Sequence, residues 1–259
     1  MSEKGVVLSL DGKVAVVTGG SRGIGAAIVR LFCRAGARVL FNYQRASQEA
    51  NALVRECGLE QCAAVQAELS SPEAAAKLVQ AAVERFGRVD IVVGNHGVWP
   101  PLDVPIDEMT EQQWRNTLAV NLDSIFGLVK SGVGQMKKQR SGGHIVLISS
   151  TAGQRGEAFH CDYAASKGAL ISMVKGLSTE LARDRIYVNC VAPGWVETDM
   201  AAPALRDPEI GKRVFATIPL GRAGTAEEIG GTVLFLCSRY AGFITGEIVN
   251  ANGGAVLVG

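Results

Sequence analysis

A glycine-rich run between an apolar strand and a helix is the feature of this sequence that most constrains its fold. The apolar segment Val14–Val17 is typical of a buried strand, and Ala26–Ala35 follows a helical pattern. Between them lies the run Thr18-Gly19-Gly20-Ser21-Arg22-Gly23-Ile24-Gly25. Free backbone N–H groups and the helix dipole make such a turn an anion site, and glycines let a phosphate approach the backbone. The run therefore predicts a site for a dinucleotide pyrophosphate, although similar turns also serve as plain connections.

The same run contains the pattern Gly-x-Ser-x-Gly, which marks the nucleophile of α/β-hydrolases. That fold needs an acid and then a histidine later in the chain. The three histidines are His96, His144 and His160, so residues 161–259 contain no histidine. The run also follows the first strand, so no preceding sheet is available. We therefore reject a hydrolase nucleophile at Ser21.

Seven short apolar runs alternate with helical patterns along the chain. They are Val14–Val17, Val39–Phe41, Ala63–Val65, Ile91–Val93, Ile145–Ile148, Val188–Val191 and Ile248–Asn250. Short strands separated by helices predict βαβ units, and hence a parallel sheet with helices on both faces. We predict an α/β fold in which residues 1–259 form a single Rossmann-type doubly wound domain with seven parallel strands.

Composition excludes several classes of protein. Hydrophobic residues make up 47% of the chain, enough for a large core, and the net charge is +1 without a long basic block. We therefore expect no nucleic-acid partner. No segment approaches the roughly 18 apolar residues of a membrane span, so we expect no membrane partner. Six cysteines are scattered without a Cys-x-x-Cys pair. We interpret them as small buried side chains of a cytoplasmic protein and expect no metal site.

Polar residues that follow the strands indicate where a ligand binds. In a doubly wound sheet, ligands bind beyond the carboxyl ends of the strands. The polar segments at those ends are Gly19–Gly25, Asn42–Arg45, Glu68, Asn95–Gly97, Ser149–Ser150 and Pro193–Thr198. We expect these segments to converge at one edge of the sheet.

Tyr163 and Lys167 are four residues apart, so they share one face of a helix. Ser150 lies 13 residues before Tyr163, at the end of an expected strand. A free phenol has a pKa near about 10, and a nearby ammonium is expected to bring the pKa of Tyr163 down towards neutrality. A serine hydroxyl is able to hold a substrate oxygen beside the tyrosine. The group therefore predicts proton transfer to a carbonyl while a nicotinamide delivers hydride.

With these motifs the chain resembles the short-chain dehydrogenase/reductase family, from about Leu10 to the C-terminus. The family's Thr-Gly-x-x-x-Gly-x-Gly turn matches Thr18 to Gly25. Its Ser…Tyr-x-x-x-Lys group matches Ser150, Tyr163 and Lys167. Its helical asparagine matches Asn121, and its Pro-Gly-x-Val-x-Thr segment matches Pro193, Gly194, Val196 and Thr198.

The resemblance implies a role for each matching residue. Tyr163 is the expected general acid in ketone reduction, or the base in alcohol oxidation. Lys167 is expected to hold the nicotinamide ribose, Ser150 to polarise the carbonyl, and Asn121 to anchor a water in a proton relay. An asparagine inside a helix also fits a structural role, compatible with a kink there. The expected cofactor contacts are Gly19, Ser21, Arg22, Gly23, Ile24, Gly25, Asn42, Tyr43, Arg45, Glu68, Leu69, Asn95, His96, Gly97, Tyr163, Lys167, Pro193, Gly194, Val196 and Thr198.

The sequence departs from the family pattern at two places. The family's Asn-Asn-Ala-Gly reads Gly94-Asn95-His96-Gly97 here, so His96 is either a ligand contact or a packing substitution. The aspartate that usually contacts adenine is replaced by Glu68, which Leu69 follows. We assign both residues the adenine role.

The end of the second strand indicates which nicotinamide cofactor binds. NAD-specific folds place an acid there to bind the ribose hydroxyls. Here the strand continues Phe41-Asn42-Tyr43-Gln44-Arg45, without a carboxylate. The guanidinium groups of Arg22 and Arg45 suit a 2′-phosphate, although arginines in such positions also simply face solvent. We predict a preference for NADP(H), with NAD(H) as a weaker alternative.

Within the family, the pattern looks most like the 3-oxoacyl-(acyl-carrier-protein) reductases. The likeness is carried by Asn121-Leu122, Tyr163–Lys167, Ile218–Arg222, Ala226–Ile229, Phe243–Gly246 and Asn252–Gly254. Sugar, steroid and other secondary-alcohol dehydrogenases share these segments and stay open as alternatives, as does a non-catalytic dinucleotide-binding sensor. The substrate is therefore expected to be a small-molecule or acyl-thioester carbonyl compound.

The residues around the expected substrate site do not decide between substrates. Trp99, Trp195 and Phe159 suit an apolar pocket, whereas Glu157 and His160 suit a polar substrate. We expect residues 200–215 to cover the bound substrate as a lid.

The resemblance also implies assembly. Family members commonly form tetramers through the helices around Trp114–Lys138 and Tyr163–Arg183 and through the C-terminal strand. The apolar segment Gly246–Gly259 suits such a contact. We therefore expect a homotetramer, or a homodimer.

Overall fold

Seven parallel strands form the centre of the molecule. The computed structural model describes residues 7–258, so residues 1–6 and Gly259, included in the predicted domain and C-terminal segment, lie outside it. The strands are β1 (Val14–Val17), β2 (Arg38–Tyr43), β3 (Cys62–Gln66), β4 (Ile91–Gly94), β5 (Gly143–Ile148), β6 (Ile186–Pro193) and β7 (Ile248–Ala251). Their order in the sheet is β3-β2-β1-β4-β5-β6-β7. The seven-stranded, doubly wound fold predicted from the sequence is confirmed.

Helices connect the strands. They are α1 (Gly23–Arg34), α2 (Ser47–Cys57), α3 (Pro72–Phe86), α4 (Glu111–Leu118), α5 (Ser124–Gln139), α6 (Thr151–Arg155), α7 (Cys161–Leu181), α8 (Ala202–Arg206), α9 (Pro208–Ala216) and α10 (Ala226–Leu236). A π-helical turn (Ala119–Asp123) joins α4 to α5, and 3₁₀ turns occupy Ala182–Asp184 and Arg239–Ala241. Among residues 7–258, no helix has both the length and the apolar content that a membrane crossing requires.

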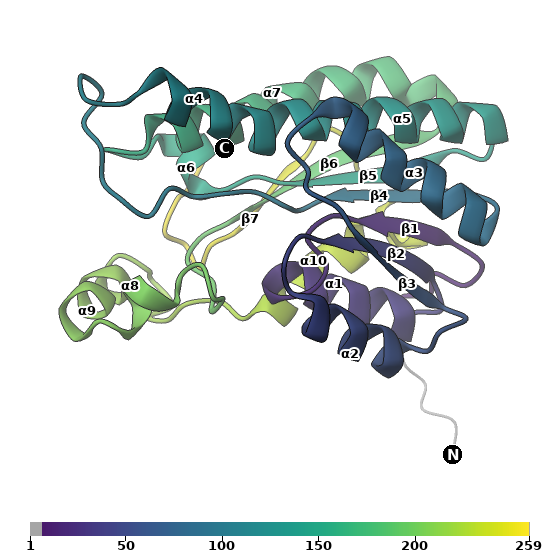
Figure 1. Ribbon diagram of the computed structural model, residues 1–259, viewed down its shortest axis with the longest axis horizontal. Helices are drawn as coiled ribbons and strands as arrows, with labels where there is room; N and C mark the ends of the chain where they lie inside the picture. Colours follow the sequence, from purple (N-terminus) through teal and green to yellow (C-terminus); the bar gives the residue numbers. More distant parts are fainter. Residues whose placement is uncertain (1–6, 259) are drawn as a thin grey trace.

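The sheet separates two hydrophobic layers, because successive strand side chains point to opposite faces. Ala15 and Val17 of β1 face the layer formed with α1, α2 and α10. Val14 and Val16 face the layer formed with α3, α5 and α7. Figure 1 shows these two groups of helices on either side of the sheet, with α8 and α9 set apart near the carboxyl ends of the strands. Both faces are therefore covered, as in other parallel sheets.

Two strands, β2 and β6, continue two residues beyond the ends that their apolar runs predict. Asn42 and Tyr43, expected in a loop, continue β2 because they pair with Val65 and Gln66 of β3. β6 likewise extends to Pro193, which pairs with Ala251 of β7. The apolar runs end too early at these two strands, because pairing with a neighbouring strand includes polar residues and proline that an apolar pattern leaves out.

The strand order places a crevice beside β1. The chain first builds outward from β1 through β2 to β3, and then crosses back to place β4 on the other side of β1. The loops after β1 and β4 therefore diverge to opposite sides, which opens a ligand site between them. This is the location that the glycine-rich turn predicts.

Candidate active site

The glycine-rich turn leads directly into the N-terminus of α1. No described side chain caps this helix, whose N-cap is Arg22, so its first N–H groups remain directed out of the helix. A side chain at Gly25 would collide with the carbonyl of Gly19 and with Asn95. Gly23 has a φ of 53°, a left-handed conformation that glycine adopts without strain. The backbone thus forms a cradle that fits a pyrophosphate.

Asn42 hydrogen-bonds to the glycine-rich turn. Its Oδ1 accepts a hydrogen bond of 2.8 Å from the N–H of Gly19, and its Nδ2 donates to the carbonyl of Ala67 at 3.0 Å. Asn42 is almost fully buried. Its side chain therefore connects the turns after β1 and β3.

The remaining residues predicted at the adenine end are divided between surface and core. Arg45 and Glu68 are exposed, and Tyr43 is half-buried. Leu69 is only 5% exposed and packs in the core layer of α3 and α5. The side chain of Leu69 is therefore part of the core and does not provide the contact predicted for it.

Asn95 and His96 fix the loop after β4 to the loop after β1. Asn95 Nδ2 donates to the carbonyl of Thr18 at 2.8 Å. His96 Nδ1 lies 2.8 Å from Thr18 Oγ1, and Nε2 lies 2.7 Å from Ser124 Oγ at the start of α5. Burial and the charge of Lys167 lower the pKa of His96 to about 3. The ring is therefore neutral and bridges two elements, which favours the packing interpretation of His96.

Ser150, Tyr163 and Lys167 come together at the carboxyl end of β5. Ser150 is the N-cap of α6 and accepts a hydrogen bond from the N–H of Ala152. It lies close enough to Tyr163, in the first turn of α7, to lower the pKa of that phenol. One turn further on, the buried Lys167 Nζ donates to the carbonyl of Ile148 at 2.9 Å. The Nζ atom lies 5.8 Å from the centroid of the Tyr163 ring.

The ionisation of this group differs from the sequence prediction. Burial raises the pKa of Tyr163 to about 12, an effect opposed by the nearby hydroxyl of Ser150 and reinforced by the charge of Glu157. Burial also lowers the pKa of Lys167 to about 8. The pKa of the phenol is therefore raised, and not lowered as the sequence predicts, because desolvation by burial is the largest effect on it. In this arrangement Tyr163 is a protonated donor at neutral pH.

Asn121 lies within the π-helical turn between α4 and α5. Its Oδ1 accepts from the N–H of Val98 at 2.8 Å, and its Nδ2 donates to the carbonyl of Val98 and to Ser166 Oγ. The helix is therefore irregular at Asn121, where its turn is wider than an α-helical one. It places a buried amide between the loop after β4 and helix α7.

Gly97 provides space beside this amide. A Cβ at Gly97 would lie 3.1 Å from Asn121 Oδ1 and 3.3 Å from Lys167 Nζ. A side chain at Gly97 would therefore require Asn121 or Lys167 to move by a few tenths of an ångström. Asn121, Gly97 and Lys167 form one tightly fitted contact.

The segment after β6 closes the other side of the crevice. Val196 is buried, and Thr198 lies against the glycine-rich turn, since a Cβ at Gly23 would be 3.2 Å from Thr198 Cγ2. Gly194 is tightly fitted against Asn252. Residues more than 170 positions apart thus form one wall.

The region next to Tyr163 has a polar side as well as aromatic rings. Trp99 stacks on His160 with ring centroids 4.7 Å apart, and its Nε1 donates to Glu157 Oε1 at 3.3 Å. Burial raises the pKa of Glu157. Phe159 is 52% exposed, and Trp195 is half-buried. The lid region, residues 200–215, contains α8 and α9.

The structure also identifies Asp162, which the sequence analysis did not select. Its buried Oδ2 accepts from Thr117 Oγ1 at 2.7 Å and from Gln113 Nε2 at 3.2 Å, while Oδ1 has no partner among the described residues. Asp162 thereby ties the first turn of α7, and with it Tyr163, to α4. The one available signal was its position directly before Tyr163.

Comparisons with known proteins agree with this geometry. A family profile described as "Enoyl-(Acyl carrier protein) reductase" matches residues 19–256. The 3-oxoacyl-(acyl-carrier-protein) reductase of Vibrio cholerae is 38% identical over 97% of this chain and 100% of that protein. A solved structure from Brucella melitensis, titled short-chain dehydrogenase/reductase and glucose/ribitol dehydrogenase, is 34% identical. The alignment covers 96% of this chain and 98% of that chain, with a TM-score of 0.87.

A second solved structure carries a cofactor. It is a putative 2-deoxy-D-gluconate 3-dehydrogenase from Agrobacterium tumefaciens with bound NADP, 29% identical to this chain. The alignment covers 97% of this chain and 99% of that chain, with a TM-score of 0.88. With the parallel sheet and glycine-rich turn described above, these matches lead to one conclusion. The chain belongs to the short-chain dehydrogenase/reductase family of oxidoreductases.

Proposed function

We propose that this chain is an NADPH-dependent reductase that converts a ketone into a secondary alcohol, with a 3-oxoacyl thioester as its substrate. The observation that carries the proposal is the grouping of Ser150, Tyr163 and the buried Lys167, whose Nζ lies 5.8 Å from the centre of the Tyr163 ring. This group lies near the N-terminus of α1, which no described side chain caps. Binding a nucleotide requires no such proton donor. One domain would hold both cofactor and substrate.

The residues of the crevice fit a dinucleotide. The turn from Gly19 to Gly25 would hold the pyrophosphate, and Asn95, Gly97, Val196 and Thr198 would line the path to the nicotinamide. When bound, the nicotinamide supplies or accepts the hydride. The adenine end would lie between Tyr43, Glu68 and Leu69.

The chain's own residues manage the proton. Tyr163, protonated because burial raises its pKa to about 12, donates its hydroxyl proton to the carbonyl oxygen as that oxygen gains negative charge. Ser150 Oγ donates a second hydrogen bond to the same oxygen, which stabilises the developing charge. Lys167 holds a positive charge beneath the phenol and stabilises the phenolate that remains. Asn121 positions the loop after β4 and helix α7 around this group.

A preference for NADP(H) is supported by charge. Arg22 and Arg45 are exposed, and the residues that end β2 and follow it, Asn42 to Arg45, include no carboxylate. A guanidinium binds phosphate oxygens through two parallel hydrogen bonds. The Agrobacterium tumefaciens relative contains NADP in its solved structure.

The name of the Vibrio cholerae relative supports a 3-oxoacyl thioester substrate. A second candidate, a sugar or other polyhydroxylated alcohol, is favoured by the half-buried Glu157 and its contact with Trp99. A carboxylate at the substrate site accepts hydrogen bonds from hydroxyl groups, which an acyl chain lacks.

The test is a panel of substrates assayed by NADPH consumption: a 3-oxoacyl thioester, a 2-enoyl thioester, a ketosugar and a cyclic ketone. We expect the highest kcat/KM with the 3-oxoacyl thioester. A higher value with the ketosugar would transfer the assignment to the second candidate. A preference for the enoyl thioester would overturn carbonyl reduction.

The variant Tyr163→Phe separates catalysis from binding. We expect it to lose turnover while NADPH still binds, as followed by nucleotide fluorescence. Tyr187→Phe is the matched control, because Tyr187 stacks on His144 at the opposite end of β6. NADPH binding without turnover of any substrate by the wild type would favour a non-catalytic sensor.

Two further properties complete the proposal. A homotetramer or homodimer is supported by large apolar side chains that stay exposed on the expected interface, including Trp114 (37%), Phe126 (51%) and Leu257 (86%). Light scattering that gives a monomer at micromolar concentration would contradict it.

A cytoplasmic location is supported by the six cysteines, all of which are free thiols in the part of the chain that the structure describes.

A further inference from the structure

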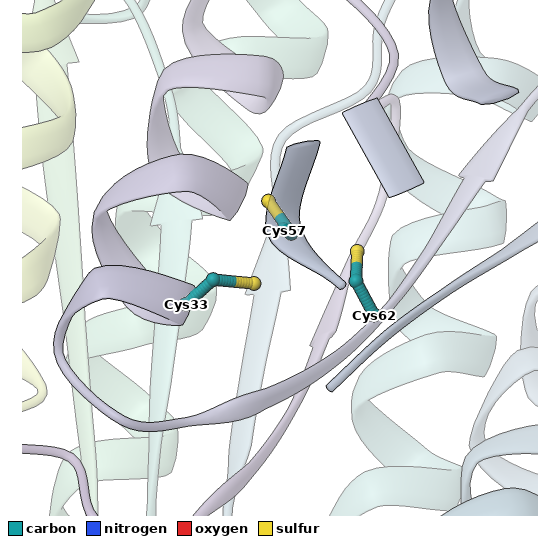
Figure 2. A group of neighbouring side chains, drawn as sticks. All are labelled: Cys33, Cys57 and Cys62. Carbon is teal, nitrogen blue, oxygen red and sulfur yellow. The ribbon is translucent and has the colours of Figure 1, made fainter. Parts of the chain in front are cut away.

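Three cysteines that are scattered in the sequence meet in the structure. Cys33 lies in the last turn of α1, Cys57 is the last residue of α2, and Cys62 is the first residue of β3. Their Sγ atoms all lie within 4.8 Å of one another. Figure 2 shows the three side chains projecting from separate elements towards a common space. The sequence showed no Cys-x-x-Cys pair, because tertiary contacts rather than sequence neighbours bring these thiols together.

The cluster lies at the end of the sheet opposite the candidate active site. Cys62 pairs with Val39 at the start of β2, whereas the site occupies the carboxyl ends of the strands. The thiols are therefore separate from the proton-transfer group. None of them is needed for the reaction proposed above.

Hydrogen bonds fix the backbone around the cluster. Gln61 Nε2 donates to the carbonyls of Cys33 and Ala37. The N–H of Cys62 donates to the carbonyl of Gly58 at 2.9 Å. The last turn of α1, the end of α2 and the start of β3 are thus held together independently of the sulfur atoms. A preformed arrangement lowers the entropic cost of binding a ligand, because fewer groups must be ordered.

We propose that Cys33, Cys57 and Cys62 bind one soft, thiophilic metal ion, Zn²⁺ or Cu⁺, through three thiolates. Thiolates are the preferred ligands of both ions. A zinc–sulfur bond of about 2.3 Å places two sulfur ligands about 3.8 Å apart in a tetrahedral site. The three sulfur atoms therefore need to approach by less than about 1 Å, within the reach of side-chain torsions. Metal binding would release the three thiol protons.

The number of ligands distinguishes the two ions. Among residues 7–258, no fourth histidine, cysteine, aspartate or glutamate atom joins the group. Cys33 and Cys62 are buried, whereas Cys57 is half-exposed. Three thiolates satisfy Cu⁺ without another ligand, whereas Zn²⁺ needs a water on the exposed side of Cys57 to complete four ligands.

Positive charges lie close to the cluster in the chain. Arg30 and Arg34 precede and follow Cys33 on α1. Glu56, next to Cys57 in the chain, is bound by Arg30 with Nε–Oε distances of 2.9 Å. Its negative charge is therefore partly neutralised. Both arginines lie on α1, the helix that contributes Cys33, and they would offset the negative charge of three thiolates.

A metal here would act on stability. It would connect α1, α2 and β3, the elements that carry the adenine half of the nucleotide site. A ligand that binds only the folded chain raises the unfolding temperature by mass action. We expect this stabilisation without a change in the reaction that Tyr163 performs.

The experiment uses the full chain, reduced by a phosphine and stripped of metal. Zn²⁺ is titrated against a chromophoric chelator, and Cu⁺ against a copper(I) chelator without oxygen. Co²⁺ in place of Zn²⁺ gives a thiolate-to-metal charge-transfer band that reports sulfur ligands. We expect one equivalent of Zn²⁺ or Cu⁺ per chain and a higher unfolding temperature with the metal. The ion that the protein removes from its chelator is the ion that the site binds.

Cys57→Ala is the decisive variant, because Cys57 is half-exposed and its loss disturbs little of the core. Removing even a supporting residue of a metal site costs about 10–100-fold in affinity, so we expect loss of a ligand to cost more than about 100-fold. Cys237→Ala is the matched control, a buried cysteine outside the cluster. We expect it to bind metal like the wild type.

Three results would overturn the proposal. The first is the absence of stoichiometric Zn²⁺ or Cu⁺ binding by the reduced wild type. The second is equal binding by Cys57→Ala. The third is a cluster that responds only to oxidants, by forming a disulfide. Reductase activity is measured separately, so failure of the metal site does not bear on the proposed function.

Discussion

Arg22 Nη1 lies 3.4 Å from Asp199 Oδ2, which joins the N-cap of α1 to the segment after β6. Both side chains are largely exposed. A pair of this kind contributes only about 0–1 kcal/mol to stability, so it opens readily. The guanidinium proposed to bind the 2′-phosphate of NADPH therefore has a competing carboxylate within reach.

This pair makes a prediction about cofactor choice. Because a hydrogen bond between charged groups contributes about 1.5–3 kcal/mol, we expect Arg22→Gln to raise the KM for NADPH at least about tenfold and to leave the KM for NADH unchanged. Asp199→Asn should lower the KM for NADPH by up to about fivefold, since it removes the competitor. Initial rates with both cofactors measure the effects. Arg34→Gln, at the opposite end of α1, is the control, and an unchanged NADPH/NADH ratio in Arg22→Gln would refute the assignment.

The buried ammonium of Lys167 makes a prediction about stability. Its pKa falls from 10.5 to about 8 on folding, so the unfolded chain holds a proton between these values that the folded chain has released. The free energy of unfolding therefore increases as pH rises from 8 towards 10.5, by about 2 kcal/mol at pH 9.5. Lys167→Met lacks this contribution. Denaturant titrations at pH 7 and 9.5 measure the free energy of unfolding. The difference between the wild type and Lys167→Met should change by that amount in favour of the wild type. The difference between the wild type and the exposed Lys175→Met should stay constant.

The same two groups predict how the rate depends on pH. Ketone reduction needs a protonated Tyr163 and a charged Lys167, and the lower of their pKa values is that of Lys167 at about 8. We expect kcat for reduction to be level below pH 8 and to fall above it as the ammonium loses its proton. Alcohol oxidation needs the phenolate and should accelerate as pH rises. A reduction rate that stays level to pH 10 would show that Lys167 keeps its proton.

His96 predicts a loss of stability in acid. Its pKa is lowered from 6.5 to about 3 in the folded chain, so the unfolded chain takes up a proton first as pH falls. The free energy of unfolding should therefore decrease between pH 6.5 and 5, by about 2 kcal/mol relative to His96→Asn. Chemical denaturation of both proteins at the two pH values measures this. Parallel pH dependence would mean that the imidazole is not desolvated between Thr18 and Ser124.

Asn121 predicts a coupled loss of stability and activity. Asn121→Leu keeps the size of the side chain but leaves the N–H and carbonyl of Val98 without their partners. Because these groups are only partly buried, each costs about 1 kcal/mol, the lower end of the range for buried groups, so we expect a loss of about 2 kcal/mol and a lower kcat as Lys167 shifts. Asn116→Leu, exposed on α4, should change stability by less than about 0.5 kcal/mol. If Asn121→Leu retains the stability and kcat of the wild type, the π-helical turn is not held by this amide.

The limits of the sequence prediction are visible in particular residues. The apolar runs gave the strands, because burial on both faces of a parallel sheet demands continuous apolar residues. They missed Asn42 and Pro193 at the strand ends, since pairing with a neighbouring strand decides where a strand stops. The spacing of Tyr163 and Lys167 placed both on one helix face, but their ionisation depended on burial, which the sequence does not show.

Local chemistry in the sequence determined the glycine-rich turn, the alternation of strands and helices and the Ser150–Tyr163–Lys167 group, because each depends on residues close together in the chain or on a repeating pattern. Only the tertiary structure decided that Lys167 is desolvated, that Asp199 reaches Arg22, and that His96 bridges Thr18 and Ser124. The tertiary structure alone also decides that Cys33, Cys57 and Cys62 lie together. These features arise from contacts between elements distant in sequence, and their energies depend on how much water the packed chain excludes.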